Sequence, residues 1–492
     1  MRAQRSKLNP KVAVSVVFVL AMFMTIMDAT IVNVALPQLG KQFGVPAAHV
    51  DTVVVGFLVS LAVFIPASGW LGDRFGTKRV FLTALVVFTA ASALCGMAQS
   101  IDQLVLFRVL QGVGGGMLAP VGMAMLFRAF PPEERVAASR ILIVPTALAP
   151  ATGPVLGGLL VTDLSWRWAF YVNVPMGIAG FVFGLLFLHE ARQDDAGRFD
   201  LPGFVLAGAG LAALMYAVSE GPARGWTSPT IDVTAAAGVL LCAALVVVEL
   251  RTSAPMLDLR LLGNRLFRSA TTVLVLSTVS FLGTLFLVAL FFQDGFGVSA
   301  LQSGLSTFPE ALGIMAGAQI AARLYPYIGP RRLMRGGLIG VAVSIGLMAL
   351  VPFTASLWVM RVLMVFLGLS QAHVFAPAQA AAFATISPAA TGRASGMFNA
   401  GRQLGGAVGV ALLSTVISAV GVMRQTGSGP APNAAAYHWA FVAAAAVALF
   451  AAALTPAIDD RAAAPTMRRA PAPEPYAELP APTEVGALRS EA

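Results

Sequence analysis

The chain has 492 residues, of which 58% are hydrophobic and 11% charged, and its mean hydropathy is +0.81. Soluble globular domains carry about 25% charged residues, so this composition excludes a soluble domain and indicates an integral membrane protein in a lipid bilayer. The formal net charge of +9 would suit a protein that binds nucleic acid. Its distribution favours a topological origin instead, so we expect no nucleic-acid partner.

Apolar segments follow one another along most of the chain. About fourteen of them, each of roughly 18–28 residues, are long enough to cross a hydrocarbon core of about 30 Å as a helix. They lie at 12–36, 50–70, 79–98, 104–126, 140–162, 169–188, 201–219, 231–250, 269–292, 302–322, 333–352, 356–384, 394–421 and 437–457. We therefore predict an all-α membrane protein with fourteen spanning helices.

The basic residues predict the topology. If both termini are cytoplasmic, most of the 32 Lys and Arg residues lie in cytoplasmic segments. The exceptions are four outside residues (Lys41, Arg167, Arg224 and Arg424) and three within helices (Arg108, Arg361 and Arg402). This asymmetry matches the positive-inside rule and favours an even number of spans in the cell membrane.

Two stretches recur at an offset of 253 residues. LVLFRVLQG (104–112) matches LWVMRVLMV (357–365), with Arg108 opposite Arg361, and GDRFGTKRVFL (72–82) matches YPYIGPRRLMR (325–335). Parallel repeats of this kind are common in membrane transporters. We predict a six-helix bundle at 1–190, a linker with two inserted helices at 191–265 and a second six-helix bundle at 266–458. A disordered cytoplasmic tail would occupy 459–492.

An aspartate interrupts the first apolar segment, in MDATIVNVALP (27–37). An ionisable group in hydrocarbon costs at least about 2.5–3.5 kcal/mol, so Asp28 is a functional candidate. Its carboxylate could exchange a proton or hold a cation. The alternative is an aspartate that only hydrogen-bonds to a neighbouring helix.

Other polar residues inside the spans are candidates for the same region. Arg108 would favour a charged Asp28 whereas burial would favour a neutral one, so rearranging the pair could drive protonation. Glu310 lies about nine residues inside its span, near mid-depth. His373 could titrate near neutrality or serve as a neutral core residue. Arg361, Arg402 and Gln403 are further candidates, whereas Asp232, Glu249 and Asp294 lie at span ends, where we expect solvated roles.

Two glycine-containing motifs are also candidates for a functional role. In GWLGDRFGTKR (69–79), Gly69 and Gly76 allow close approach and a tight turn. Asp73 can accept hydrogen bonds at a facing helix N-terminus, and Arg74, Lys78 and Arg79 could pair with it or with another acid. In APATGPVLGG (149–158), Gly153, Gly157 and Gly158 surround Pro154, a pattern that suits close helix contact and a bend. The simpler alternatives are topological charge for Lys78 and Arg79 and ordinary small-residue packing for the glycines.

These motifs, in this order, resemble the major facilitator superfamily and, within it, the drug:proton antiporters with fourteen helices (the EmrB/QacA type). The resemblance covers most of residues 10–457; Thr77 departs from the loop motif, where many relatives are basic. The residues and segments that carry the resemblance are Asp28, Thr30, Asn33, Ala35, Leu36 and Pro37; the loop at 69–79; Arg108, Gln111, Gly112 and Gly116; Gly153, Pro154, Gly157 and Gly158; and WRWAFYVNVP (166–175).

The resemblance implies a monomeric, proton-coupled exporter of hydrophobic and cationic compounds that works by alternating access. Asp28 and Arg108 would couple export to protons, the loop at 69–79 would gate the cytoplasmic side, and Gly153–Gly158 would be an antiporter motif. Residues expected to line the substrate path are Glu310, Asn33, Gln111, His373, Arg361, Arg402 and Gln403.

The sequence contains no phosphate-binding loop, HExxH motif or Cys/His ligand set, so we expect no enzyme activity, cofactor or metal. Two alternatives remain open. One is a narrow exporter of a lipid or a secreted metabolite with the same fold. The other is a membrane sensor without transport, against which the costly intramembrane charges argue.

Overall fold

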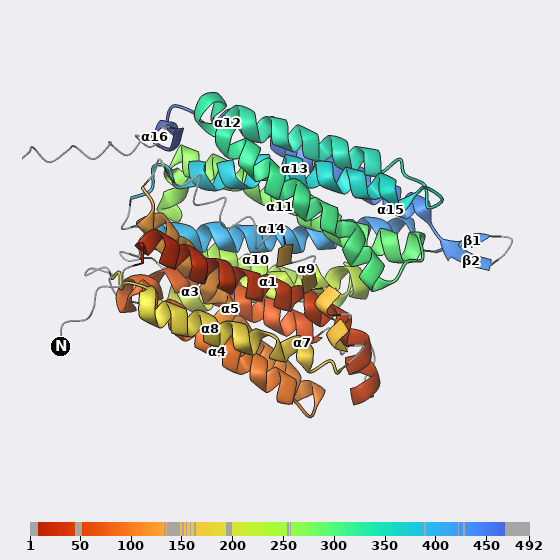
Figure 1. Ribbon diagram of the computed structural model, residues 1–492, viewed down its shortest axis with the longest axis horizontal. Helices are drawn as coiled ribbons and strands as arrows, with labels where there is room; N and C mark the ends of the chain where they lie inside the picture. Colours follow the sequence, from red (N-terminus) through yellow and green to blue (C-terminus); the bar gives the residue numbers. More distant parts are fainter. Residues whose placement is uncertain are drawn as a thin grey trace, which may run out of the picture.

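A computed structural model of the chain shows long helices that run side by side along its longest axis (Figure 1). It describes residues 8–44, 52–131, 134, 148–149, 152–153, 155–157, 159–161, 164–192, 199–252, 255, 257–387, 390–421, 423–426 and 429–467. Within these residues, eleven helices are long and apolar enough to cross a membrane. The predicted span at 140–162 lies largely outside the described residues.

The helices fall into two halves and an insert. The first half contains α1 (Pro10–Phe43), α3 (Thr52–Phe75), α4 (Thr77–Met97), α5 (Ile101–Ala129), α7 (Trp168–Tyr171) and α8 (Asn173–Phe187). The insert contains α9 (Leu201–Arg224) and α10 (Pro229–Arg251), followed by the 3₁₀ turn η2 (Leu259–Gly263). The second half contains α11 (Arg265–Leu290), the π-helical η3 (Phe291–Gly295), α12 (Ala300–Met348), α13 (Leu357–Ala382), α14 (Thr391–Val420), α15 (Ala434–Leu454), η5 (Thr455–Ala457) and α16 (Ala464–Met467). Between α14 and α15, β1 (Met423–Thr426) and β2 (Gly429–Pro432) form an antiparallel hairpin.

Local sequence explains where several helices begin. The side chains of Asn9, Ser100 and Asp200 accept backbone N–H groups of the first turns of α1, α5 and α9, at 3.0, 3.2 and 2.9 Å. Short polar side chains at this position satisfy donors that the helix itself leaves unpaired. The long apolar runs are thereby divided into separate helices.

The sequence repeat is visible as two matching glycine turns. Gly76 (φ +97°) separates α3 from α4, and Gly329 (φ +74°) breaks α12 between the predicted spans 302–322 and 333–352. A left-handed φ is strained for residues with a Cβ, which explains glycine at both positions. The two spans are therefore two helical arms of α12 that meet at the non-helical Gly329, as α3 and α4 meet at Gly76.

A carboxylate lies against each glycine turn. Glu190 Oε1 accepts the backbone N–H of Lys78 (3.0 Å), at the start of α4. Asp460 Oδ1 accepts the backbone N–H of Arg331 (2.9 Å), at the start of the second arm of α12. Each carboxylate thereby occupies a helix N-terminus, where the helix dipole favours an anion.

The two ends of the bundle differ. We call the end with Gly76, Gly329 and α16 the basic end, and the end with β1 and β2 the hairpin end; the start of α1 and α16 lie at the same end (Figure 1). At the basic end one apolar cluster contains residues of both halves, with the rings of Phe127 and Phe383 4.7 Å apart. At the hairpin end the buried residues form one cluster around Phe170 in the first half and another around Phe291 in the second. The halves are thus packed together most extensively at the basic end.

The inserted helix α9 lies on the outside of the contact between the halves. α9 packs on both α3 and α14: Phe204 lies edge-on to Phe64 of α3 (ring centroids 5.7 Å), and Met215 is buried in a cluster that includes Leu404 of α14. Trp226, which follows α9, donates from Nε1 to Thr415 Oγ1 of α14 (2.7 Å). α9 therefore covers the line along which α3 and α14 meet.

Two predicted solvated regions are ordered and packed. Residues 459–467 fall in the predicted disordered tail, yet Thr466 is buried and hydrogen-bonds to Tyr325 Oη of α12 (2.8 Å). Glu249 is 1% exposed rather than solvated, because the chain after α10 folds back and donates the Leu257 N–H to Glu249 Oε1 (3.1 Å). Residues 468–492 lie outside the described residues.

Candidate functional site

Asp28, Arg108 and Gln111 meet in the interior of the first half, and all three side chains are fully buried. Arg108 Nη1 donates to Asp28 Oδ2 (2.6 Å) and to Gln111 Oε1 (2.7 Å). Gln111 Nε2 donates to Asp28 Oδ1 (2.8 Å). The side chains expected from α1 and α5 are thus joined in one network. Removing one partner of a buried ion pair costs about 3–5 kcal/mol, so the network also fastens these helices together.

A further member of this network, Asn173, comes from α8 and was not among the predicted site residues. Its Nδ2 donates to Asp28 Oδ1 (2.7 Å) and to Ser92 Oγ of α4 (3.1 Å), and its side chain is fully buried. The available sequence indication was a polar residue immediately before VP in the WRWAFYVNVP stretch. Asn33, also expected here, lies on α1, and its side chain is outside the described part of the chain.

Aromatic rings enclose the guanidinium of Arg108. Its Cζ lies 4.0 Å from the ring centroid of Phe57 and 5.9 Å from that of Phe170. Its Nε donates to the backbone carbonyl of Val53 (3.3 Å). Cation–π contact and hydrogen bonding replace the water that the charge has lost, so Arg108 is held in one orientation toward Asp28.

The second half has the arginine of this network without the acid. At the repeat offset Arg361 of α13 corresponds to Arg108, but Phe281 of α11 corresponds to Asp28. Arg361 donates from Nη2 to Ser306 Oγ of α12 (3.2 Å) and lies 4.7 Å from the ring of Trp358. Among the described residues, an aspartate–arginine pair therefore forms at this level in the first half and not in the second.

Glu310 is separate from the Asp28 network. It lies on α12 one turn after Ser306, and its side chain is 5% exposed. Its backbone carbonyl packs against Gly368 of α13, where no Cβ would fit. Within the described residues its carboxylate has neither a hydrogen bond nor an ion pair. A cation could satisfy this carboxylate, provided that α12 or α13 moves enough to admit one.

The other predicted substrate residues lie on α13 and α14. His373 Nδ1 contacts the Leu369 carbonyl of its own helix (2.7 Å), an arrangement that suits a structural residue. Arg402 and Gln403 are half-buried on α14 and have no hydrogen-bond partner in the described part of the chain. They lie one turn beyond Asn399, which contacts Met123 of α5, so they share the face of α14 turned toward the first half.

The gate motif joins α3 to α14 at the basic end. A Cβ on Gly69 would lie 2.7 Å from the Gly392 carbonyl oxygen, so the two helices touch through their backbones. The Asp73 carboxylate oxygens lie 3.0 Å from the position of a Cβ on Gly392, in the first turn of α14. Asp73 also forms a buried ion pair with Arg128 Nη2 of α5 (2.5 Å). Arg128, which was not predicted, is thus the cation partner of Asp73.

Two basic residues of the motif, Lys78 and Arg79, contact the end of α8 and the residues that follow it. Lys78 Nζ donates to the carbonyls of Leu185 (2.8 Å) and Leu188 (2.7 Å), at the end of α8. Arg79 lies 3.7 Å from the Glu190 carboxylate. Neither pairs with Asp73, which was one of the expected arrangements, and Arg74 has no ion-pair partner among the described residues.

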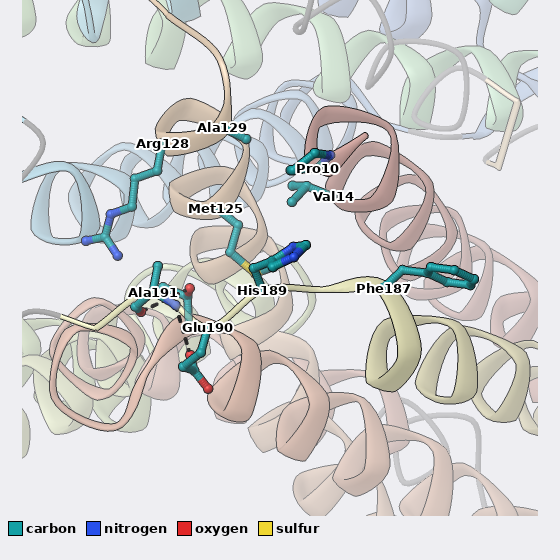
Figure 2. A pocket seen from close by; sticks show the side chains of 10 residues that line it. Pro10, Val14, Met125, Arg128, Ala129, Phe187, His189, Glu190 and Ala191 are labelled. Atoms are coloured by element: carbon teal, nitrogen blue, oxygen red, sulfur yellow. Dashed lines mark hydrogen bonds between the residues drawn. The ribbon is translucent and has the colours of Figure 1, made fainter. Parts of the chain in front are cut away.

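A cavity of about 180 Å³ lies at the basic end, between the start of α1, the end of α5 and residues 187–191 (Figure 2). Arg128, His189 and Glu190 line it, and in Figure 2 the Arg128 guanidinium points away from His189. Cavities that hold drug-sized molecules are about 300–1,000 Å³. This one is too small for such a ligand and belongs to the closed basic end.

The antiporter motif is described only in part. Gly153 is buried and packs directly on Thr30 of α1, so that a Cβ would collide with the threonine side chain. Gly157 is also buried, whereas Pro154 and Gly158 lie outside the described residues. In the described residues, no group of three or more His, Cys, Asp or Glu side chains converges as a metal site would require.

A family model described as "Major Facilitator Superfamily" matches residues 18–410 and 272–490. The chain belongs to the major facilitator superfamily. The Asp28 network lies within the first of its two halves.

Relatives of the chain are named multidrug resistance proteins. It is 34% identical over 406 residues to a "Multidrug resistance protein B homolog" of Mycobacterium tuberculosis, covering 82% of this chain and 75% of that protein. It is 34% identical over 347 residues to a "Putative multidrug resistance protein MdtD" of Serratia proteamaculans, covering 70% of this chain and 72% of that protein. Both relatives are 34% identical to this chain over more than two thirds of its length, which agrees with the family assignment.

A solved structure supports the fold. The crystal structure of the human organic anion transporter MFSD10 (TETRAN) aligns with a TM-score of 0.63, covering 91% of this chain and 99% of that one. The two sequences are 18% identical, so this likeness concerns the fold alone.

Proposed function

We propose that this protein is a proton-coupled multidrug exporter of the cell membrane, with fourteen spanning helices and both termini in the cytoplasm. It works as a monomer and exchanges protons for hydrophobic and cationic compounds by alternating access. The observation that carries this proposal is the buried Asp28 network. Asp28 is a carboxylate in a spanning helix that is paired with one arginine and two amides, and it can act as a titratable switch. Placing such a charge in hydrocarbon costs free energy, and a protein that only serves as a scaffold would gain nothing from it.

The basic end corresponds to the cytoplasmic side, in agreement with the positive-inside rule. The contacts between α3 and α14 and the shared apolar cluster then close the cytoplasmic side, as expected of an outward-facing state. In this state Asp28 receives a proton from outside. Neutralising Asp28 weakens its attraction to Arg108, α1 and α5 shift, and the halves rock to the inward-facing state.

Substrate binds between the halves, where Glu310 supplies the negative charge. Arg361, Arg402, Gln403, Asn33, Gln111 and His373 supply polar contacts or support the walls of the path. The unpaired state of the Glu310 carboxylate among the described residues supports this role, because a lipophilic cation would satisfy it. Multidrug resistance proteins among the relatives support a broad substrate range over a narrow one.

The test is uptake of ethidium into inverted membrane vesicles. With an inwardly acidic proton gradient, the wild-type protein should accumulate the dye, and a protonophore should abolish accumulation. Asp28→Asn keeps the size and most hydrogen bonds but cannot titrate, so it should fold and lose gradient-driven uptake. Asp232→Asn, at an exposed aspartate at the start of α10, is the matched control and should keep it. Full uptake by the Asp28→Asn variant would exclude Asp28 as the coupling group.

A further inference from the structure

The three partners of Asp28 differ in whether they can accept a hydrogen bond from it. Arg108 carries only N–H groups and accepts none. Gln111 has an acceptor, but its Oε1 already receives Arg108 Nη1 (2.7 Å) and lies 3.7 Å from the thiol of Cys95. Turning the Gln111 amide would place its N–H groups against these donors. Neither partner can therefore stabilise an Asp28 carboxyl group that carries a proton.

Asn173 is differently placed. Its Nδ2 donates to Asp28 Oδ1 (2.7 Å) and Ser92 Oγ (3.1 Å), whereas its Oδ1 is buried without a hydrogen-bond partner in the described part of the chain. A buried amide oxygen without a partner costs about 1–3 kcal/mol. Half a turn about the Cβ–Cγ bond would bring this oxygen to the place that Nδ2 now occupies. Nothing on its oxygen side holds the Asn173 amide in the present orientation.

Ser92 can follow such a turn. Its hydroxyl now donates to the Phe170 carbonyl (2.9 Å) while accepting from Asn173. A hydroxyl is both a donor and an acceptor, so its hydrogen can swing to the Asn173 oxygen once that oxygen faces it. The charged and titratable groups that face Asp28 among the described residues are Arg108 of α5 and Cys95 of α4, while α8 contributes the neutral Asn173.

We infer that Asn173 and Ser92 form a two-position hydrogen-bond switch that stabilises both protonation states of Asp28. In the charged state Asn173 donates to Oδ1. In the neutral state a proton has added to a lone pair of Oδ1, no other covalent bond changes, and the new O–H donates to Asn173 Oδ1. Asn173 is thus a positioning residue for proton exchange, and this role rests on the proposed function of Asp28.

Infrared difference spectroscopy of the purified protein in lipid vesicles, recorded between high and low pH, tests the switch. The wild-type spectrum should contain a carboxyl C=O band that Asp28→Asn removes. Asn173→Leu keeps the volume but removes the acceptor, so this band should move to higher frequency. Because the charged state loses a stronger hydrogen bond than the neutral one, the pH at which the band is half-developed should rise by about one unit.

Two further variants make the test specific. Ser92→Ala should move the band in the same direction by less, and it carries the test if Asn173→Leu does not fold. Asn399→Leu removes another buried asparagine, on α14, and should leave the band unchanged. A band present in the wild type but unmoved in both Asn173→Leu and Ser92→Ala would overturn the switch alone. Absence of any Asp28 band would overturn the proposed function and the switch together.

Discussion

Asp28 and Glu310 are both buried carboxylates, yet their surroundings differ. Asp28 receives three hydrogen-bond donors, one of which is the guanidinium of Arg108, and these leave no place for another cation. Glu310 receives none from the described residues. A carboxylate that is already neutralised suits proton exchange, in which only a proton has to enter. An unpaired one suits recognition of a cationic substrate, because direct attraction is strong where the local dielectric is low.

Glu310→Gln should therefore separate substrates by charge. Transport of cationic ethidium should fall at least about tenfold, a loss of about 1.4 kcal/mol of interaction, while transport of a neutral hydrophobic drug should persist. Rates are compared in the same vesicles. Glu220→Gln, at a glutamate already paired with Arg224 (2.7 Å), is the control and should affect neither. Loss of both activities would instead make Glu310 a second proton carrier.

At the scale of elements, α3 and α14 form the contact that opens during transport in the proposed alternating-access cycle. Gly69 and Gly392 allow their backbones to touch, and Asp73 lies at the first turn of α14 while paired with Arg128. The negative charge of Asp73 favours this contact through the helix dipole by about 0.3–1 kcal/mol. The same charge also holds α5 through Arg128, so three helices meet at one carboxylate.

Asp73→Asn should weaken the closed basic end. Loss of the dipole contribution alone should raise the open population roughly two- to fivefold. A cysteine at Met123, buried between α5 and α14, is a suitable reporter once Cys95 and Cys242 are replaced. Its labelling from the cytoplasmic side should accelerate in Asp73→Asn. It should not change in Asp459→Asn, which removes an exposed charge at the same end, and equal labelling in both variants would reduce the motif to a topological role.

Prediction from sequence worked best where the free-energy cost of an unpaired charge or an exposed apolar segment allows few arrangements. The spans follow from hydropathy, and the Asp28–Arg108 contact follows because a charge in hydrocarbon requires a partner. Asn173 and Arg128 were not predicted because they lie 145 and 55 residues along the chain from the acids they contact. The local periodicity of a sequence contains no information on contacts between residues so far apart. Glu249 was misjudged because its burial depends on how the chain after α10 folds back.

At the scale of the molecule, the proposed alternating-access cycle requires the two halves to separate at the basic end. The Asp73 Cγ lies 3.2 Å from the position of a Cβ on Gly392, close enough for cysteines at both positions to form a disulfide. In a background without Cys95 and Cys242, oxidation of the pair Asp73→Cys and Gly392→Cys should stop ethidium transport, and a reductant should restore it to the level before oxidation. Ethidium transport by each of the two single-cysteine variants should not change on oxidation. Transport by fully cross-linked protein would show that this contact does not open.

The carboxylates at the two glycine turns have a consequence for how the chain can be shortened. Glu190 lies three residues beyond the end of α8, and Asp460 lies three residues beyond the end of η5. Each accepts the backbone N–H of the second residue after the glycine turn of its half, Lys78 or Arg331. In each half, the segment that follows the last spanning helix is therefore bound to an earlier helix of the same half. Removing the residues after Met467 keeps Asp460 and its hydrogen bond to the Arg331 N–H. A chain that ends at Ala457 would instead lack Asp460, so the turn at Gly329 would lose the carboxylate that lies against it.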